Sequence, residues 1–93
     1  MREKAIESKL VKAVKSMGGL APKFVSPGYD GMPDRLVLLP KGKTAFVEMK
    51  APGKTLRPLQ ERRKAQIERL GIRVYVIDSE TQIEEVLREI QSA

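Results

Sequence analysis

Two carboxylates and a lysine near the middle of the chain are the residues best suited to chemistry. Asp34 ends a loop rich in glycine and proline, and Glu48 and Lys50 follow within a short apolar run. Two converging carboxylates form the hard oxygen site that Mg²⁺ or Mn²⁺ prefers, with water and substrate phosphate completing the shell. A lysine beside such an ion can stabilise charge on a phosphate under attack or hold the attacking water.

A hairpin is needed to bring these residues together. Residues 35–39 and 44–50 have the β-branched and apolar character of strands, and Pro40-Lys41-Gly42-Lys43 between them is typical of a four-residue turn. Pairing the two segments across that turn places Asp34 near Glu48. The spacing therefore predicts that both carboxylates meet at one end of the hairpin.

Glu48 and Lys50 lie on a strand that is otherwise apolar. Because they are two residues apart, both side chains leave the same face of the sheet, about 6.6 Å apart. Charged groups in apolar surroundings are costly unless they pair or bind an ion. On this strand alone, a structural ion pair or a solvated face explains the two charges as well as a metal site does. The opposite face is expected to carry Ala45, Val47 and Met49.

The remaining segments predict an alternation of helices and strands. Apolar residues recur at steps of three and four in the first, fourth and last segments, as in amphipathic helices, whereas β-branched runs indicate strands. The expected order is helix, strand, hairpin, helix, strand, helix. Helices are predicted over 2–17, over 58–70 and from about 79 or 81 onward, and further strands over 20–25 and 72–77.

The composition fits an ordinary globular chain with a basic charge. At 41% hydrophobic and 32% charged residues, the 93 residues predict one compact domain over 1–93 rather than a disordered chain. Lys and Arg number 18 against 12 Asp and Glu, and the formal charge of +6 favours a polyanionic partner such as nucleic acid. A membrane partner is not expected, because no helix combines a basic face with bulky aromatic residues.

Cysteine and histidine are both absent from the sequence. Their absence excludes disulfides, thiolate catalysis, Ser/His triads and the usual Cys/His zinc sites, so catalysis must use carboxylates, lysines or hydroxyls. No run of about 18 apolar residues could span a bilayer, and the N-terminal MREKAIESKL lacks the apolar core of a signal peptide. A cytoplasmic location is the resulting expectation.

The motifs around these residues resemble those of a known family. The sequence contains Gly31-Met32-Pro33-Asp34-Arg35, then Phe46-Val47-Glu48-Met49-Lys50, and then Pro52-Gly53, Leu56 and Gln60. This series is similar to the PD-(D/E)XK nuclease superfamily, and specifically to its VRR-NUC branch, over nearly the whole chain. The resemblance implies an α/β restriction-endonuclease-like core of order αβββαβ, with a mixed sheet flanked by helices and an added C-terminal helix.

The resemblance also implies roles for individual residues. Asp34, Glu48 and the backbone carbonyl of Met49 would bind Mg²⁺ or Mn²⁺, and Lys50 would be the catalytic lysine. Glu7 on the first helix resembles an additional acidic residue that reaches the metal or its water. The alternative interpretation is that Glu7 is a charge at the helix edge that pairs with a nearby lysine. Gln60 resembles a glutamine that lies near the active site.

Basic residues after the second hairpin strand are candidate DNA contacts. They would bind phosphates and so supply salt-dependent affinity rather than sequence reading, although each charge alone could simply be solvated. Tyr29 is a candidate for a stacking or wedge contact, and Arg35 of the motif is a further candidate. The basic set is Lys54, Arg57, Arg62, Arg63 and Lys64.

The expected function is that of a metal-dependent, structure-selective DNA endonuclease. Small stand-alone proteins of this kind suggest cutting of four-way (Holliday) junctions by a homodimer, because two symmetric nicks require two sites. The apolar face of the last helix is the expected dimer interface. The alternatives are a non-catalytic basic DNA-binding module of the same fold, and a structural or regulatory protein whose DNA binding would show no salt dependence.

Overall fold

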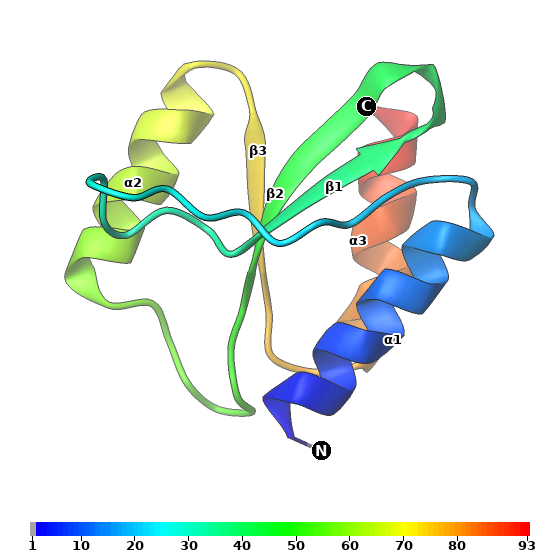
Figure 1. Cartoon of the computed structure of the whole chain (residues 1–93), viewed down its shortest axis with the longest axis horizontal. Coiled ribbons are helices and arrows are strands. Elements are labelled where there is room, and N and C mark those ends of the chain that lie inside the picture. Colours follow the sequence, from blue (N-terminus) through cyan, green and yellow to red (C-terminus); the bar gives the residue numbers. More distant parts are fainter. Residues whose placement is uncertain (1) are drawn as a thin grey trace.

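A three-stranded mixed sheet with three helices forms the computed structural model, which describes residues 2–93 (Figure 1). β2 is the central strand, antiparallel to β1 and parallel to β3. The predicted α/β class with a mixed sheet is confirmed. The elements are α1 (Glu3–Ser16), β1 (Arg35–Leu39), the 3₁₀ turn η1 (Pro40–Gly42), β2 (Lys43–Met49), α2 (Pro58–Arg69), β3 (Arg73–Ile77) and α3 (Thr81–Ser92).

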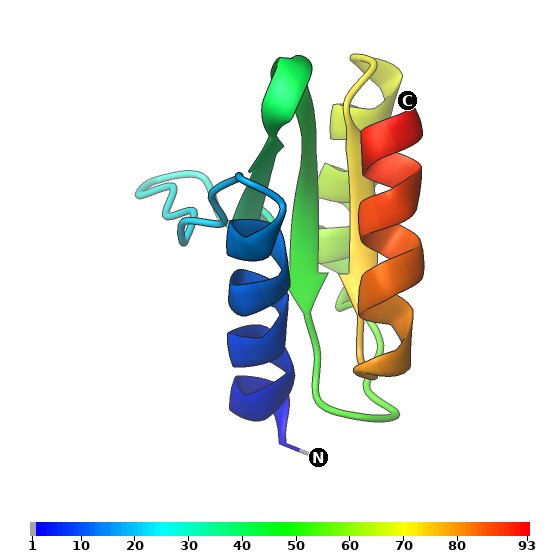
Figure 2. The ribbon, with the colours of Figure 1, turned by 90° about the vertical axis from the view of Figure 1, so that its right-hand side faces the viewer.

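The helices cover the two faces of the sheet unequally. α1 and α3 lie side by side on one face, and α2 lies on the other (Figures 1 and 2). The larger core lies under α1 and α3 and includes Ala45, Val47 and Met49 of β2, which are almost fully buried. The smaller core, under α2, includes Phe46 and Ile67. The predicted division of β2 into two opposite faces is therefore confirmed.

The segment predicted as a strand over 20–25 is extended but does not form a regular strand. It makes only isolated bridges to β1, between Leu20 and Leu38 and between Lys23 and Arg35. Pro22 lacks an N–H group and contributes only its carbonyl, which accepts a bond from Leu36 N. The prediction of a regular strand there was wrong because the proline interrupts the ladder.

The hairpin turn is shorter than predicted. β2 begins at Lys43, which pairs with Leu39, so the turn contains only the three residues of η1. Lys41 has a positive φ of 68° inside this turn, a backbone conformation that residues other than glycine rarely adopt. The shorter turn shifts every pair of the hairpin by one position, so Arg35 lies opposite Val47 rather than opposite Glu48, and Asp34 remains at the Glu48 end of β2.

The apolar face of α3 is used by the chain's own core. Its residues Ile83, Val86, Leu87 and Ile90 are all at most 8% exposed and pack into the larger core. The expectation that this face forms a dimer interface was therefore wrong. None of the helices within residues 2–93 has the length and apolarity needed to cross a membrane.

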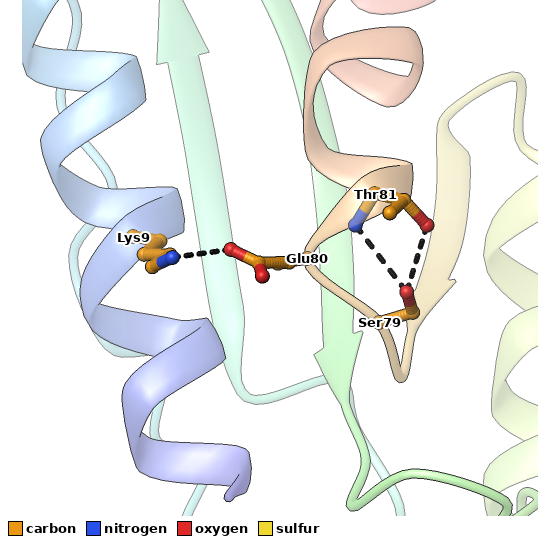
Figure 3. Close-up of polar contacts among 4 residues, drawn as sticks. All are labelled: Lys9, Ser79, Glu80 and Thr81. Atoms are coloured by element: carbon orange, nitrogen blue, oxygen red, sulfur yellow. Dashed lines mark hydrogen bonds and ion pairs between the residues drawn. The ribbon is translucent and has the colours of Figure 1, made fainter. Parts of the chain in front are cut away.

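Polar contacts hold the start of α3 in place (Figure 3). Lys9 of α1 forms an ion pair with Glu80, and the Thr81 N–H donates to Ser79 Oγ at 3.3 Å. The Gln82 side chain accepts bonds from Asp78 N at 2.8 Å and from Ser79 N at 3.1 Å, which ties the residues before α3 to its first turn. The ion pair connects the start of α3 to α1, on the face of the sheet opposite α2, and the other bonds are local to the start of α3.

Candidate active site

Asp34 and Glu48 meet at the end of the β1–β2 hairpin. Arg35 pairs with Val47, so the residue before β1 lies opposite Glu48 on the antiparallel partner. The N–H of Met49 donates to Asp34 Oδ1 at 3.0 Å, which holds this carboxylate against β2. The predicted proximity of the two carboxylates is thereby confirmed.

The backbone of β2 also directs a carbonyl toward this site. The next N–H, from Lys50, points the other way and donates to Ile77 O of β3 at 2.9 Å. The N–H and C=O groups of one strand residue point to the same side, so the Met49 carbonyl faces Asp34 together with the Met49 N–H. The donor set at this end of β2 is thus two carboxylates and one carbonyl.

Glu48 is held by two side chains on the α2 face of the sheet. It is only 6% exposed, and its Oε2 accepts a bond from Gln60 Nε2 at 2.9 Å. Lys50 Nζ lies 3.6 Å from the same oxygen. Gln60 Oε1 in turn accepts the N–H of Arg57, at 2.9 Å, so one side chain both caps α2 and orients Glu48.

The two carboxylates resist being ionised together. Burial and, to a smaller extent, the nearby charge of Asp34 raise the pKa of Glu48 to about 7, while Lys50 opposes both effects. Burial also raises the pKa of Asp34, against the lowering effect of the Met49 N–H, and the charge of Glu7 adds to the rise. A buried carboxylate pair of this kind is favoured in its ionised form when a cation shares the site. The hard oxygen donors therefore fit a divalent ion such as Mg²⁺ or Mn²⁺.

Glu7 lies close enough to affect Asp34 but is bound elsewhere. Its Oε2 accepts a bond from Arg35 Nε at 2.9 Å, so its partner is an arginine rather than the lysine considered from the sequence. Arg35 also donates to the carbonyl of Ala21 at 2.6 Å, and its side chain is only 13% exposed. Among residues 2–93 no group of three or more acidic, His or Cys side chains gathers around a common point. Glu7 and Arg35 therefore satisfy each other in this arrangement.

The basic residues predicted as one cluster separate in the structure. Arg63 lies 3.8 Å from the centre of the Tyr29 ring and donates to Asp30 O at 2.8 Å, so it holds the loop before Asp34. Lys64 forms an ion pair with Glu68 at 3.0 Å. The side chains of Arg63 and Lys64 are therefore both engaged within the protein. Arg63 covers part of the Tyr29 ring, and 47% of the Tyr29 residue remains exposed to solvent.

The other basic residues of that set are exposed and point in different directions. Lys54 and Arg57 lie in the connection between β2 and α2, and the Arg57 backbone N–H bonds Gln60, the residue that holds Glu48. Arg62 is two positions from the buried Gln60, about 200° around the helix, and thus points away from the sheet. The structure therefore places two of these cations in the connection between β2 and α2, and one on the side of α2 away from the sheet.

Two contacts that support the site were not expected from the sequence. One is the clamp of Arg63 on Tyr29, and the other is the ion pair of Arg35 with Glu7. A signal for the first was available at Gly31, which has a φ of 89° and lies so close to α2 that a Cβ would meet Leu59 Cγ at 2.7 Å. A glycine in that loop marks a close approach between the loop and a neighbouring element.

Comparisons with known proteins give three matches to this chain. The VRR-NUC domain family matches residues 3–81, a span that contains Glu7, Asp34, Glu48, Lys50 and Gln60. A protein of the Acyrthosiphon pisum secondary endosymbiont phage 1, named "Putative nuclease p44", is 54% identical over 80 residues, which are 86% of each chain. A solved structure described as a VRR_NUC domain has a TM-score of 0.86 and 30% identity, covering 92% of this chain and 94% of that chain.

Proposed function

Because the chain belongs to the VRR-NUC domain family, we propose that it is a metal-dependent DNA endonuclease that selects branched DNA and cuts four-way (Holliday) junctions as a homodimer. The observation that carries the proposal is the pair of Asp34 and Glu48 at adjoining strand ends, with Lys50 and Gln60 on one oxygen of Glu48. The basic charge of +6 supports a polyanionic substrate.

A divalent ion is part of this proposal. Asp34, Glu48 and the Met49 carbonyl would hold Mg²⁺ or Mn²⁺, which when bound polarises a phosphoryl oxygen and makes water a stronger nucleophile. The burial that raises the pKa of Glu48 supports the assignment, because a cation relieves the cost of ionising both carboxylates. Glu7 would join as a further acidic group by exchanging its contact with Arg35 for the ion.

Lys50 and Gln60 have separate tasks in the proposed reaction. Lys50 Nζ, 3.6 Å from Glu48 Oε2, puts a positive charge where negative charge develops on the phosphate oxygens. Gln60 would fix the carboxylate of Glu48 by its bond of 2.9 Å, so that the carboxylate needs no rearrangement on binding. Only Lys50 of the two would contact the substrate.

DNA would cross the site over the surface groove that forms where the loop before Asp34 packs against the start of α2. Lys54 and Arg57, both exposed in the connection between β2 and α2, would contact phosphates. Tyr29 would stack against a base or sugar with the ring surface that Arg63 leaves uncovered. Arg62, Lys64 and Arg35 are weaker candidates, because Arg62 points away and the other two are paired.

The homodimer is proposed from symmetry. Residues 2–93 contain one such site per chain, and a four-way junction needs two symmetric nicks, which a twofold dimer supplies. The interface would lie outside the apolar face of α3, which the core already uses. Light scattering of the chain alone and on a junction tests this: a single chain per junction that still cuts both strands would overturn it.

The nuclease assignment is tested by cleavage of a panel of four-way junction, flap and linear duplex DNA with Mg²⁺, Mn²⁺ or EDTA. We expect metal-dependent cutting, fastest on the junction, that Asp34→Asn and Lys50→Ala abolish while DNA binding persists. The exposed Glu85→Gln on α3 is the matched control and should cut normally. If no substrate is cut with either metal, the proposal fails, and persistent salt-dependent binding would then favour the non-catalytic DNA-binding module.

A further inference from the structure

A second basic surface lies on α1, on the opposite side of the site from α2. A groove of about 430 Å³ is bounded by α1, by the extended segment after it and by the start of β1. Four of its charged lining residues are cations and one is an anion. They are Lys4, Glu7, Lys12, Lys23 and Arg35.

The three lysines of this groove keep their charge available. Glu7 is bound to Arg35, and these two neutralise each other at the groove floor. Within residues 2–93, no carboxylate lies within ion-pair distance of Lys4, Lys12 or Lys23, and all three are exposed. The charged residues that line the groove therefore sum to +3, and this charge comes from three unpaired lysines.

The groove between α1 and α3 has no such excess. It is lined by two cations and two anions, and these pair as Lys9 with Glu80 and Arg88 with Glu84. α1 thus has one face with paired charges and one face with free lysines. A partner of high negative charge fits only the second face.

This groove is continuous with the proposed active site. Arg35 directly follows Asp34, and the backbones of Lys23 and Arg35 pair in an isolated antiparallel β-bridge. The N–H of Phe24 donates to Asp34 O at 2.8 Å. Lys4 and Lys12 are eight residues apart on one helix, which corresponds to about 12 Å along its axis at 1.5 Å per residue. The phosphates of one strand of a duplex recur about every 3.4 Å along the DNA axis, so this length faces three to four of them when α1 lies parallel to that axis.

We propose that this groove binds the sugar-phosphate backbone of the DNA beyond the cut phosphate, through Lys4, Lys12 and Lys23. The inference rests on the proposed function, since DNA must first lie across the carboxylates. The contacts would be to phosphates and therefore independent of base sequence. Together with Lys54 and Arg57, the groove holds the DNA on both sides of the site, so the cut phosphate is fixed between two anchored segments.

The test measures the salt dependence of binding by fluorescence anisotropy. The full chain is titrated onto a labelled four-way junction and a linear duplex in EDTA, from 50 to 200 mM NaCl. We expect each of Lys4→Gln, Lys12→Gln and Lys23→Gln to reduce the slope of log K against log salt by about 0.9, and the triple variant by two to three. The Kd of the triple variant at 100 mM should rise about tenfold or more.

Lys9→Gln is the matched control, because it removes the same charge from the paired face of the same helix. It should leave the slope unchanged. In cleavage assays, the triple variant should raise KM and leave kcat unchanged, because the lysines do not contact the cut phosphate. Circular dichroism spectra should match the wild type, since all the substituted side chains are exposed.

The results separate this proposal from the function on which it rests. Equal slopes for the triple variant, Lys9→Gln and the wild type would overturn the groove proposal, even if the wild type cuts DNA. A reduced slope in the triple variant of a chain that cuts nothing would support the groove as a DNA surface and overturn the nuclease function. A reduction as large for Lys9→Gln would also overturn the proposal, because it would reflect net charge alone.

Discussion

Replacing Glu48 by glutamine should stabilise the metal-free chain at high pH while it abolishes cleavage. Folding raises the pKa of this carboxyl from its ordinary value of 4.5 to about 7, mainly through burial. The folded chain therefore takes up a proton between these two values. The stability that this proton supplies is complete below pH 4.5 and is lost as the pH rises through 7. A glutamine keeps the neutral form at every pH.

The size of the effect follows from the shift. A rise from 4.5 to about 7 corresponds to about 3 kcal/mol at about 1.36 kcal/mol per pKa unit, and relaxation around the charge reduces it to about 1 to 3 kcal/mol. Glu48 is 6% exposed, so solvent screening is small. In a domain of this size, 1 kcal/mol moves Tm by about 4 to 8 °C.

The assay is thermal unfolding in EDTA, followed by circular dichroism because the chain has no tryptophan. The Tm of Glu48→Gln should exceed that of the wild type by at least about 4 °C at pH 8 and should match it near pH 4. Glu85→Gln, at an exposed position on α3, should show no such pH dependence. An equal Tm difference at both pH values, or a less stable variant at pH 8, would refute the reasoning.

Three further results are expected. Mn²⁺ affinity, measured by calorimetry, should fall about tenfold per pH unit below 7, because Glu48 must lose its proton to bind the ion; a flat profile from pH 5.5 to 8 would contradict this. Gln60→Ala should lower single-turnover cleavage about 10- to 100-fold with DNA Kd unchanged, since it orients Glu48 without touching DNA; an unchanged rate would exclude that role. Arg63→Met should speed chymotrypsin cleavage after Tyr29, because the ring and the Asp30 carbonyl lose their partner; equal digestion rates would mean that other contacts hold the loop.

The pairing of the carboxylates could be predicted because it depends on local pattern alone. Strand periodicity places Glu48 and Lys50 on one face, and a short turn fixes which residue stands opposite Glu48. A turn of three residues instead of four moves the register by one position, so that Arg35 pairs with Val47 rather than with Glu48, but Asp34 stays at the Glu48 end of β2 and the two carboxylates still meet. The same period of two predicts which side chains of β2 face the larger core.

The contacts that hold the site could not be predicted in the same way. Glu7 and Arg35 are 28 positions apart, and nothing in either neighbourhood indicates that they pair. The bridges of segment 20–25 likewise depend on how β1 lies in the finished sheet, which overrides the local strand propensity. By contrast, the separation of Arg62 from Arg63 was predictable, because neighbours on a helix differ by about 100°.

The arrangement around Glu48 links the stability of the fold to the capacity to bind a cation. Burial on the α2 face raises the cost of its charge, and the bonds from Gln60 and Lys50 hold the carboxylate in place despite that cost. Gln60 is also the capping residue of α2, through its bond to the Arg57 N–H. A change in the charge of Glu48 therefore acts on the first turn of α2 and on Arg57, which lies where DNA would pass. Binding of a divalent ion should consequently order the start of α2 as well as the two carboxylates, so that the metal and DNA favour each other's binding.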